Sequence, residues 1–319
     1  MENGDIAYGQ LCGWLKARHL VLIDTLARTQ NMHAAAQQMN LTQPALSKML
    51  RDIEALLGFG LFERLPRSMP PTELGAHVAA YARMMLNDTA KFVAQINKLR
   101  RGGHGHVKIG AIFAATFNVL PEAIARVKEQ RPLLSVEILE QTSDKLLDML
   151  ERKEIDIVIG RFREDRHRQL FDFTALGAEP FALVGNARHP LARKRKNPTP
   201  VAALRDWPWV LYPAGTPIRE RIDEAFHGAG VEPPGNTVET ISMPTFLQLL
   251  HSGTTIALLP VPMIQEQLDQ GRLRILDSRL KVQPLEYGVI RRKDEPLSAT
   301  ARLFTETLIA QSDERRARA

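Results

Sequence analysis

The stretch TQPALSKMLRDIEALLG, residues 42–58, decides how the first third of the chain folds. Thr42 can cap a helix, and Pro44 fits in its first turn, where a missing N–H costs little. Gly58 can end the helix, because glycine readily adopts the left-handed backbone conformation found at helix ends. We therefore expect a helix from residue 43 to about residue 57.

The two sides of this helix differ in chemistry. At about 100° per residue, its apolar side carries Leu46, Met49, Leu50, Ile53 and Leu57. Its other side carries Pro44, Ser47, Lys48, Arg51 and Ala55. The second side can enter a major groove of DNA, with Ser47 near base edges and Lys48 or Arg51 near phosphates or guanine. An ordinary solvated surface helix has the same composition, so the neighbouring segments must decide between the two interpretations.

Two shorter helical patterns precede this stretch. Residues 19–28 place apolar side chains at the spacing of an amphipathic helix, and residues 32–39 form a short alanine-rich helix. A break at residues 40–42 then separates the alanine-rich helix from the longer one. A short helix, a tight turn and a second helix make up the layout of a helix-turn-helix, which is typical of DNA-binding proteins.

Residues 62–70 follow with an arginine- and proline-rich pattern that predicts a two-stranded wing. Arg64 and Arg67 on this wing can reach a neighbouring minor groove or phosphates. Residues 1–106 hold 12 Lys and Arg against 8 Asp and Glu, so this third carries +4 of the net charge of +6. The excess permits nucleic-acid binding, but it is also typical of a solvated basic surface.

The composition of the chain excludes several classes of protein. Its 319 residues, 44% of them apolar, are typical of a globular chain with two or three folding units. No apolar run is long enough to cross a bilayer and the N-terminus lacks a secretory pattern, so we expect a cytoplasmic protein with no membrane partner. The single cysteine, Cys12, excludes an internal disulfide and a zinc site with several cysteines. We expect no cofactor.

Residues 19–75 resemble the DNA-binding region of the LysR-type transcriptional regulators. The matching positions are Ala34-Ala35-Ala36, Met39, Leu41, Thr42-Gln43-Pro44-Ala45-Leu46-Ser47, Ile53-Glu54, Leu57-Gly58, Leu61-Phe62-Glu63-Arg64 and Pro71-Thr72-Glu73-Leu74-Gly75. The resemblance implies a winged helix-turn-helix that binds an operator in double-stranded DNA. Pattern and resemblance together assign eight residues to DNA: Thr42, Gln43, Pro44, Ser47, Lys48, Arg51, Arg64 and Arg67.

A long helix is expected from Thr72 to about Arg101. One face of it repeats at spacings of three and four, as along a coiled coil, through Leu74, Val78, Tyr81, Met85, Thr89, Phe92, Ile96 and Leu99. Because a helix of this length needs a partner, the stripe indicates a homodimer, which would present two DNA-reading heads to two half-sites. The alternative is that the stripe packs on the same chain's own domain.

The segment RGGHGH, residues 101–106, marks a boundary, because its glycines supply a hinge. Its two histidines lack a third ligand, so we predict no metal site there. After the hinge, short apolar runs alternate with helical patterns, which predicts α/β layers around a mostly parallel sheet. Strands are expected at 107–111, 136–140, 155–160, 181–184, 209–212, 238–241 and 255–259, and helices at 117–130, 143–151, 218–229 and 244–251.

The expected path of the chain indicates two lobes. The chain leaves the first sheet near Phe162 and returns near residues 285–290, as in periplasmic binding proteins. The resemblance to the LysR-type regulators continues more loosely here and implies a two-lobed effector-binding domain. It is carried by Ile109-Gly110, Leu120-Pro121, Leu150, Asp156-Ile157 and Leu258-Leu259-Pro260.

These expectations divide the α/β protein into three parts. Residues 1–71 form an all-α winged helix-turn-helix domain, and residues 72–103 form a long linker and dimerisation helix with its hinge. Residues 104–319 form the regulatory domain, in which lobe I spans about 104–162 and 285–319 and lobe II spans about 163–284.

Ligands of open α/β sheets lie beyond the carboxyl ends of the strands, where helix N-termini offer free N–H groups. In similar regulators such turns line the cleft between the lobes. We expect a small-molecule effector to contact Ala114, Ala115, Thr116, Thr142, Ser143, Arg161, Thr216 and Ser242. The hydroxyl residues can equally cap their helices, and Arg161 can equally be a surface residue. Arg161 would favour an anionic effector, and the apolar turn at residues 112–115 would favour an aromatic or aliphatic body.

The leading hypothesis is a transcriptional regulator in which the effector alters the spacing of the DNA-reading heads. This would change DNA bending and contact with RNA polymerase, and paired dimers would form a homotetramer. The alternatives are an enzyme or a solute-binding receptor fused to a helical head. The chain has no Walker loop, nucleophile elbow, HExxH motif or dinucleotide turn, so we do not expect an enzyme. The missing export signal and the helical head disfavour a receptor.

Overall fold

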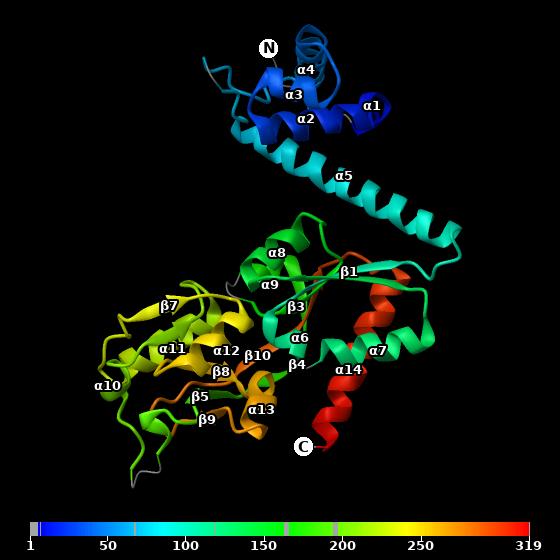
Figure 1. Cartoon of the computed structure of the whole chain (residues 1–319). Helices are drawn as coiled ribbons and strands as arrows, with labels where there is room; N and C mark the ends of the chain where they lie inside the picture. The colour runs from blue at the N-terminus through cyan, green and yellow to red at the C-terminus, as the bar shows by residue number, and fades with distance from the viewer. Residues whose placement is uncertain are drawn as a thin grey trace. The chain divides into compact units, whose positions relative to one another are not determined.

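The computed structural model divides the chain into two compact units (Figure 1). The first comprises residues 1–101 with 152–154, and the second comprises residues 102–151 with 155–319. The described residues are residue 6 and residues 8–66, 68–117, 119–162, 166–193 and 197–318. Within them, no helix is both long and apolar enough to cross a lipid bilayer.

The first unit is a helical domain. Its helices are α1 (Tyr8–Trp14), α2 (Ala17–Thr29), α3 (Met32–Gln38), α4 (Gln43–Leu57) and α5 (Glu73–Arg100). The helix expected from residue 43 is confirmed by α4. Thr42 Oγ1 accepts a hydrogen bond from the N–H of Ala45 at 3.4 Å, and Gly58 ends the helix with φ +79°. Both boundaries therefore follow from the cap residues that the sequence supplies.

The core of the first unit lies where α2 and α4 meet. Leu46, Leu50 and Ile53 of α4 are completely buried, as the apolar side of the expected helix requires. They belong to one cluster with Leu22 and Leu26 of α2. Because each such side chain contributes about 1.5–3 kcal/mol to folding, this packing fixes which side of α4 faces outward.

The segment after α4 forms a wing with very little strand structure. A single antiparallel bridge joins Phe62 to Pro71, and the N–H of Glu63 donates to the carbonyl of Pro70 at 2.9 Å. The predicted wing is present, but it contains one antiparallel bridge where two regular strands were expected. Its prolines cannot donate hydrogen bonds to a ladder, which limits the length of the pairing.

The wing is joined tightly to the start of α5. Thr72 caps α5 by accepting a hydrogen bond from the N–H of Gly75 at 2.9 Å, and its hydroxyl donates to the carbonyl of Gly60 at 2.9 Å. A Cβ on Gly75 would lie 1.9 Å from the carbonyl oxygen of Leu61. Only glycine therefore permits this close approach of α5 to the wing.

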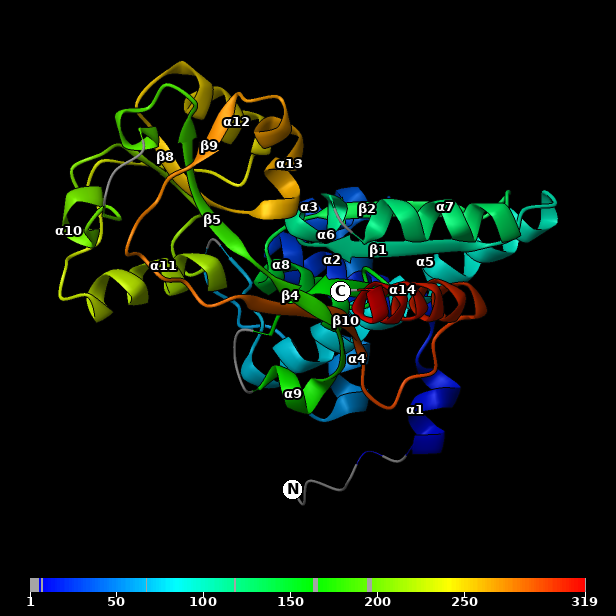
Figure 2. The ribbon, with the colours of Figure 1, turned by 90° about the horizontal axis from the view of Figure 1, so that it is seen from below.

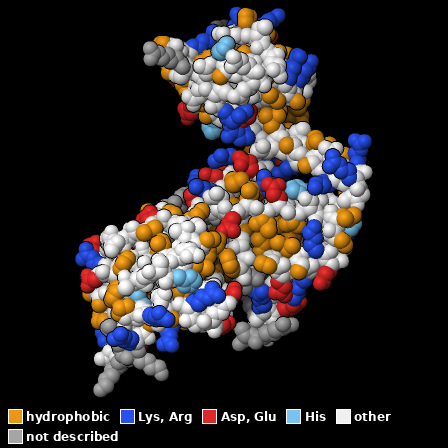
Figure 3. Space-filling model, viewed as in Figure 1, with side chains coloured by type: hydrophobic (Ala, Val, Ile, Leu, Met, Phe, Trp, Pro, Cys, Tyr) orange, Lys and Arg blue, Asp and Glu red, His pale blue; other side chains and the backbone are white. Residues whose placement is uncertain are grey.

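Helix α5 has 28 residues and packs on its own unit only in part. Arg83 pairs with Asp24 of α2 at 2.9 Å, Ala82 is completely buried, and Val78 packs against the core. Six apolar side chains of the expected stripe are exposed within this unit: Leu74, Tyr81, Met85, Phe92, Ile96 and Leu99. Figure 3 shows hydrophobic side chains reaching the surface of the unit. The alternative that the whole stripe packs on this domain is therefore wrong.

The second unit consists of two lobes, each built on a five-stranded sheet. The sheet of lobe I has the order β2-β1-β3-β10-β4 and contains β1 (His106–Ala111), β2 (Ser135–Glu140), β3 (Ile157–Gly160), β4 (Phe171–Glu179) and β10 (Leu285–Arg292). The sheet of lobe II has the order β7-β6-β8-β5-β9 and contains β5 (Phe181–Asn186), β6 (Trp209–Leu211), β7 (Thr237–Glu239), β8 (Ile256–Pro260) and β9 (Leu273–Ile275). α/β layering is confirmed.

The expectation of a mostly parallel sheet is confirmed in both lobes, because four of the five strands of each sheet run in the same direction and one runs against them. In lobe I, β1 pairs parallel with β2 and β3, whereas β10 pairs antiparallel with β3 and β4. In lobe II, β6 pairs parallel with β7 and β8, whereas β5 pairs antiparallel with β8 and β9. The antiparallel pairs arise because β10 re-enters the sheet of lobe I, and β5 that of lobe II, opposite to the strands of the βαβ units.

Helices cover the sheets of both lobes. Lobe I carries α6 (Phe113–Phe117), α7 (Leu120–Gln130), α8 (Ser143–Glu151), α9 (His167–Leu170) and α14 (Ala299–Arg318). Lobe II carries a 3-10 turn at Pro190–Ala192 and the helices α10 (Val201–Leu204), α11 (Pro217–Gly228), α12 (Met243–Ser252) and α13 (Val261–Asp269). The helix expected at 117–130 begins later, at Leu120, because Pro121 suits the first turn of a helix.

The chain passes between the lobes at two neighbouring places (Figure 2). β4 pairs with β10 so that Glu179 lies opposite Leu285, and Pro180 alone separates β4 from β5. The prediction that the chain leaves the first sheet near Phe162 is wrong, because β4 extends that sheet to Glu179. The predicted return at Leu285 is confirmed.

Candidate DNA interface and ligand pocket

The outward side of α4 is open. Six of the residues assigned to DNA lie along it or at its start, all exposed except the half-buried Ser47: Thr42, Gln43, Pro44, Ser47, Lys48 and Arg51. Within the described part of the chain, neither Lys48 nor Arg51 is paired with a carboxylate. Unpaired exposed cations on a helix that fits a major groove are suited to phosphate or guanine contacts.

The wing adds one further exposed cation to this unit, Arg64. Arg67, which was assigned to the same wing, lies outside the described residues. Arg64 follows the bridge residue Phe62, which is buried and ties the wing to the core of the unit. Its backbone is thus anchored while its side chain faces solvent.

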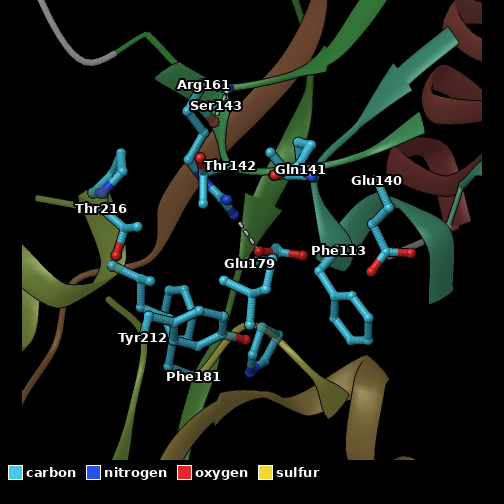
Figure 4. Close-up of a pocket in the computed structure, with 15 residues that line it drawn as sticks. Phe113, Glu140, Gln141, Thr142, Ser143, Arg161, Glu179, Phe181, Tyr212 and Thr216 are labelled. Carbon is cyan, nitrogen blue, oxygen red and sulfur yellow. Dashed lines mark hydrogen bonds and ion pairs between the residues drawn. The ribbon is translucent and has the colours of Figure 1, made fainter. Parts of the chain in front are cut away.

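A pocket lies between the two lobes of the second unit (Figure 4). Its polar lining consists of Glu140, Gln141, Thr142, Ser143, Arg161, Glu179, Tyr212 and Thr216, and its apolar lining of Ile112, Phe113, Phe181, Pro217, Ile218, Ile241 and Pro260. Most of these residues stand at the carboxyl ends of strands or at the start of α8 or α11. This is the edge of the sheet at which open α/β folds bind ligands.

Four of the residues expected at the effector lie in this pocket: Thr142, Ser143, Arg161 and Thr216. Two of their hydroxyl groups already form hydrogen bonds within the protein. Ser143 Oγ accepts a hydrogen bond from the N–H of Arg161 at 3.3 Å, and Thr216 Oγ1 donates to the carbonyl of Pro213 at 2.8 Å. Each hydroxyl oxygen keeps capacity for a further hydrogen bond.

The other four expected residues are not in the pocket lining. Ser242 caps α12 by accepting a hydrogen bond from the N–H of Thr245 at 3.4 Å, so its capping role, the alternative for the hydroxyl residues, is the observed one. The side chain of Ala115 is buried, and its N–H donates to the carbonyl of Ile112 at 2.9 Å. Thr116 lines a neighbouring groove, and the side chain of Ala114 lies outside the described part of the structure.

The strongest electrostatic feature of the pocket is the ion pair between Arg161 and Glu179. Their side chains are only 12% and 2% exposed, so Arg161 is not a surface residue. Arg161 also lies over the ring of Tyr287 at 6.0 Å. Burial raises the pKa of the Glu179 carboxyl above its usual value, and the positive charge of Arg161 acts in the opposite direction.

Several polar groups of the pocket lack the partners that they would have in water. Burial, together with the negative charges of Glu179 and Glu140, raises the pKa of the Tyr212 phenol, which therefore stays neutral. Desolvation also raises the pKa of Glu140. Gln141 Oε1 and Arg161 Nε are buried and have no hydrogen-bond partner among the described residues. Such groups favour a ligand that supplies the missing hydrogen bonds.

Sequence reasoning placed the apolar turn at residues 112–115 at the cleft, and its Ile112 and Phe113 do line the pocket, but it missed the acidic residues and the aromatic residues Phe181 and Tyr212. Glu140 and Gln141 stand directly before Thr142, so the turn that predicted Thr142 carried the signal for both. Glu179 gave no such signal, because it belongs to a strand that was not predicted. Among the described residues, no group of three His, Cys, Asp or Glu side chains could hold a metal ion.

Comparison with protein families and curated relatives covers both units. The family model "LysR substrate binding domain" matches residues 100–313, and "Bacterial regulatory helix-turn-helix protein, lysR family" matches residues 17–76. The HTH-type transcriptional regulator GbpR of Azospirillum brasilense is 32% identical over 307 residues, covering 96% of this chain and 89% of GbpR. The HTH-type transcriptional regulator GalR of Pseudomonas putida is 27% identical, covering 90% of this chain and 71% of GalR.

Solved structures share the fold over nearly the whole chain. Full-length OxyR from Pseudomonas aeruginosa has a TM-score of 0.59 at 24% identity, covering 92% of this chain and 94% of OxyR. Full-length CbnR in complex with its target DNA has a TM-score of 0.63 at 21% identity, covering 93% of this chain and 100% of CbnR. The helical unit and the two-lobed unit thus occur together in other proteins.

Proposed function

Because the chain belongs to the LysR family of bacterial DNA-binding transcriptional regulators with an effector-binding domain, we propose that it reads its operator with the outward side of α4. At the start of the helix, the DNA backbone is contacted by Thr42, Gln43 and Pro44, whereas Ser47 faces the edges of the bases. Lys48 and Arg51 contact phosphates or guanine. Arg64 and Arg67 of the wing contact the flanking minor groove or its phosphates.

The observation that carries this assignment is the unpaired state of Lys48 and Arg51 among the described residues. A cation that already has a carboxylate partner must give it up to bind a phosphate, whereas these two need not. The burial of Leu46, Leu50 and Ile53 supports it, because it turns the cationic side of α4 away from the core.

The pocket between the lobes is proposed as the effector site, with Thr142, Ser143, Arg161 and Thr216 in its lining. Its aromatic and aliphatic walls suit an effector with an apolar body. To act as a switch, the effector must bind two states of the assembly with different affinities. The proposed states differ in the spacing of the DNA-reading heads, and thus in DNA bending and contact with RNA polymerase.

The proposed assembly rests on the exposed stripe of α5. Its apolar side chains, among them Phe92 with 63% of its surface exposed, form a seam that a second copy would cover. The homodimer pairs two reading heads, and two dimers form a homotetramer. In this proposal residues 1–71 read DNA, residues 72–103 dimerise and residues 104–319 regulate.

The proposal treats the bound small molecule as a signal that is not converted. The alternatives, an enzyme or a solute receptor fused to a helical head, leave the cationic side of α4 without a role. Incubating the purified protein with a ligand found by thermal shift, followed by mass spectrometry of that ligand, separates the alternatives. Recovery of the unchanged ligand is expected, and turnover would favour an enzyme.

Footprinting of the full-length protein on its own upstream region tests the DNA assignment. Replacing Ser47 or Arg51 by alanine should weaken operator binding by about 1–3 kcal/mol for each base that the side chain no longer reaches. Lys281→Ala is the matched control, because it removes an exposed cation from the other unit. If both α4 variants footprint the operator like the parent protein, α4 does not read the groove.

A further inference from the structure

The polar groups of the pocket indicate the charge class of its ligand. We infer that the pocket takes an uncharged or positively charged small molecule that donates hydrogen bonds and has an apolar body, and that it selects against carboxylates and phosphates. The inference rests on the proposed function, because it concerns the ligand of the same pocket.

Arg161, the cation among the described residues of the lining, is already neutralised by Glu179 (Figure 4). Glu179 is tethered by the chain, so it pairs with Arg161 without the loss of translational freedom that a free anion suffers on binding. A carboxylate ligand must therefore compete with a carboxylate that is held in place and buried. The carboxylate ligand therefore gains little binding free energy from the guanidinium of Arg161 unless Glu179 moves away.

The remaining charge of the lining is negative. Glu140 also faces the pocket, so the described residues of the lining carry two carboxylates against one guanidinium, a formal charge of −1. Bringing a second anion out of water into this site is unfavourable. Burial raises the pKa of both carboxyls, and Arg161 offsets this only in part for Glu179, so further donors would stabilise the charged form of each. An ammonium or a hydroxyl group of a ligand would supply them.

Two buried polar atoms without a hydrogen-bond partner among the described residues also favour an uncharged or cationic ligand. Gln141 Oε1 is a buried acceptor with no donor among the described residues. Arg161 Nε is a buried donor without an acceptor there, and the oxygen of a neutral hydroxyl can accept from it. Both atoms are satisfied by a ligand with hydroxyl or amine groups and no full negative charge.

The apolar walls set the shape of the rest of the ligand. Phe113, Phe181 and Tyr212 contribute aromatic rings, and Ile218 and Ile241 contribute aliphatic surface. Tyr212 is held against Phe246 with ring centroids 5.1 Å apart, so its ring forms a fixed wall. A flat or compact apolar body packs on these walls while its donors reach Glu140, Gln141 and Glu179.

The test uses three probes that share one apolar body: phenylpropylamine, phenylpropanol and phenylpropanoate. Each is titrated into the full-length protein, and binding is followed by thermal shift and by isothermal titration calorimetry. We expect the amine or the alcohol to bind roughly tenfold more tightly than the carboxylate, a difference of about 1.4 kcal/mol. If the carboxylate binds most tightly, the inference is wrong, whereas the proposed role of the pocket stands.

Two variants test the charge effect with the apolar body held constant. Glu179→Gln releases the charge of Arg161, so carboxylate binding should rise about tenfold relative to the parent protein. Glu140→Gln, at a position exposed to solvent, should weaken amine binding about two- to fivefold and leave alcohol binding unchanged, because it removes a partly exposed ion pair. Arg161→Met combined with Glu179→Leu is the control that should gain no carboxylate binding.

The two proposals fail in different ways. If Glu179→Gln is folded and gains no carboxylate binding, the ion pair does not control the charge class and the inference is overturned. If Glu179→Gln does not fold, the response of Glu140→Gln to amine and alcohol decides. If no probe binds the parent protein or any folded variant, the inference is overturned, whereas the proposed role of the pocket is decided separately by whether thermal shift finds any ligand whose binding Glu179→Gln alters.

Discussion

The cations of α4 and the cation of the pocket lie in opposite electrostatic settings. Lys48 and Arg51 are exposed and have no carboxylate partner among the described residues, whereas Arg161 is almost fully buried against Glu179. The exposed setting of Lys48 and Arg51 leaves their positive charge available to a polyanion such as DNA. The buried setting of Arg161 neutralises the positive charge within the fold, which leaves hydrogen-bond acceptors for the proposed ligand of the pocket. Arginine in a binding region therefore predicts an anionic ligand only where its own counter-ion is missing.

The largest expected effect is on the buried pair. Glu179→Leu leaves the guanidinium of Arg161 buried without a counter-ion, which should lower the free energy of unfolding by about 3–5 kcal/mol. Urea unfolding of the full-length protein, followed by tryptophan fluorescence, measures this change, because Trp207 and Trp209 both lie in the second unit.

The matched control is the double variant Arg161→Met with Glu179→Leu. Replacing both charges by apolar side chains of similar size should restore the parent stability or exceed it, since neither charge is then desolvated. An equal loss of stability in the single and the double variant would show that packing, not charge, explains the first result.

A smaller effect is expected on α4. Lys48→Ala should weaken binding to operator and to unrelated DNA alike, and should reduce the slope of log affinity against log salt by about 1. Fluorescence anisotropy with labelled duplexes at several salt concentrations measures both quantities. Lys281→Ala in parallel should leave the slope unchanged, because it removes an exposed cation from the other unit. A selective loss of operator binding in Lys48→Ala would instead assign Lys48 to a base.

The smallest effect concerns a buried histidine on which the nearby cations Arg18 and Lys16 act against the nearby carboxylate of Asp52. His19 of α2 is buried against the ring of Trp14 at 4.5 Å, and its Nδ1 accepts the N–H of Lys16 at 3.2 Å. Burial, with Arg18 and Lys16 nearby, lowers the pKa of His19 below its usual 6.5. The unfolded chain therefore binds the proton first, and stability present above pH 6.5 falls as the pH drops below it.

Thermal unfolding of the full-length protein between pH 7.5 and about 5 tests this expectation. His19→Gln, which keeps a hydrogen-bond acceptor, should lose part of the pH dependence of the transition of the first unit. Unchanged pH dependence in this variant would show that other groups control the acid response. The Arg161 variants and His19→Gln together compare two buried basic side chains. Arg161 is paired with a buried carboxylate, whereas His19 is not in an ion pair with one among the described residues.

The same comparison explains what could be predicted. Helix α4 is specified locally, because Thr42, Pro44 and Gly58 set its ends and the apolar spacing sets its orientation. The pocket is assembled from strand ends that are distant in sequence. Arg161 and Glu179 lie 18 residues apart, and they meet only because β4 pairs with the late strand β10. No local pattern around Glu179 carries that information.

The hydroxyl residues show a second limit of local reasoning. Thr142, Ser143, Thr216 and Ser242 all stand at helix starts, where capping and ligand binding require the same residue types. Only their positions in the structure show which of the four line the pocket. Ser242 lies outside the pocket lining, and the other three lie within it.

The two passages of the chain between the lobes run side by side, with Glu179 opposite Leu285. Two adjacent strands act as one hinge axis, because a rotation about them changes few backbone dihedral angles. Glu179 is therefore close to the axis about which the lobes would turn. A ligand in the proposed effector site that shifted this carboxylate by a small amount would act near the pivot, and the displacement would grow with distance from it towards the far ends of both lobes.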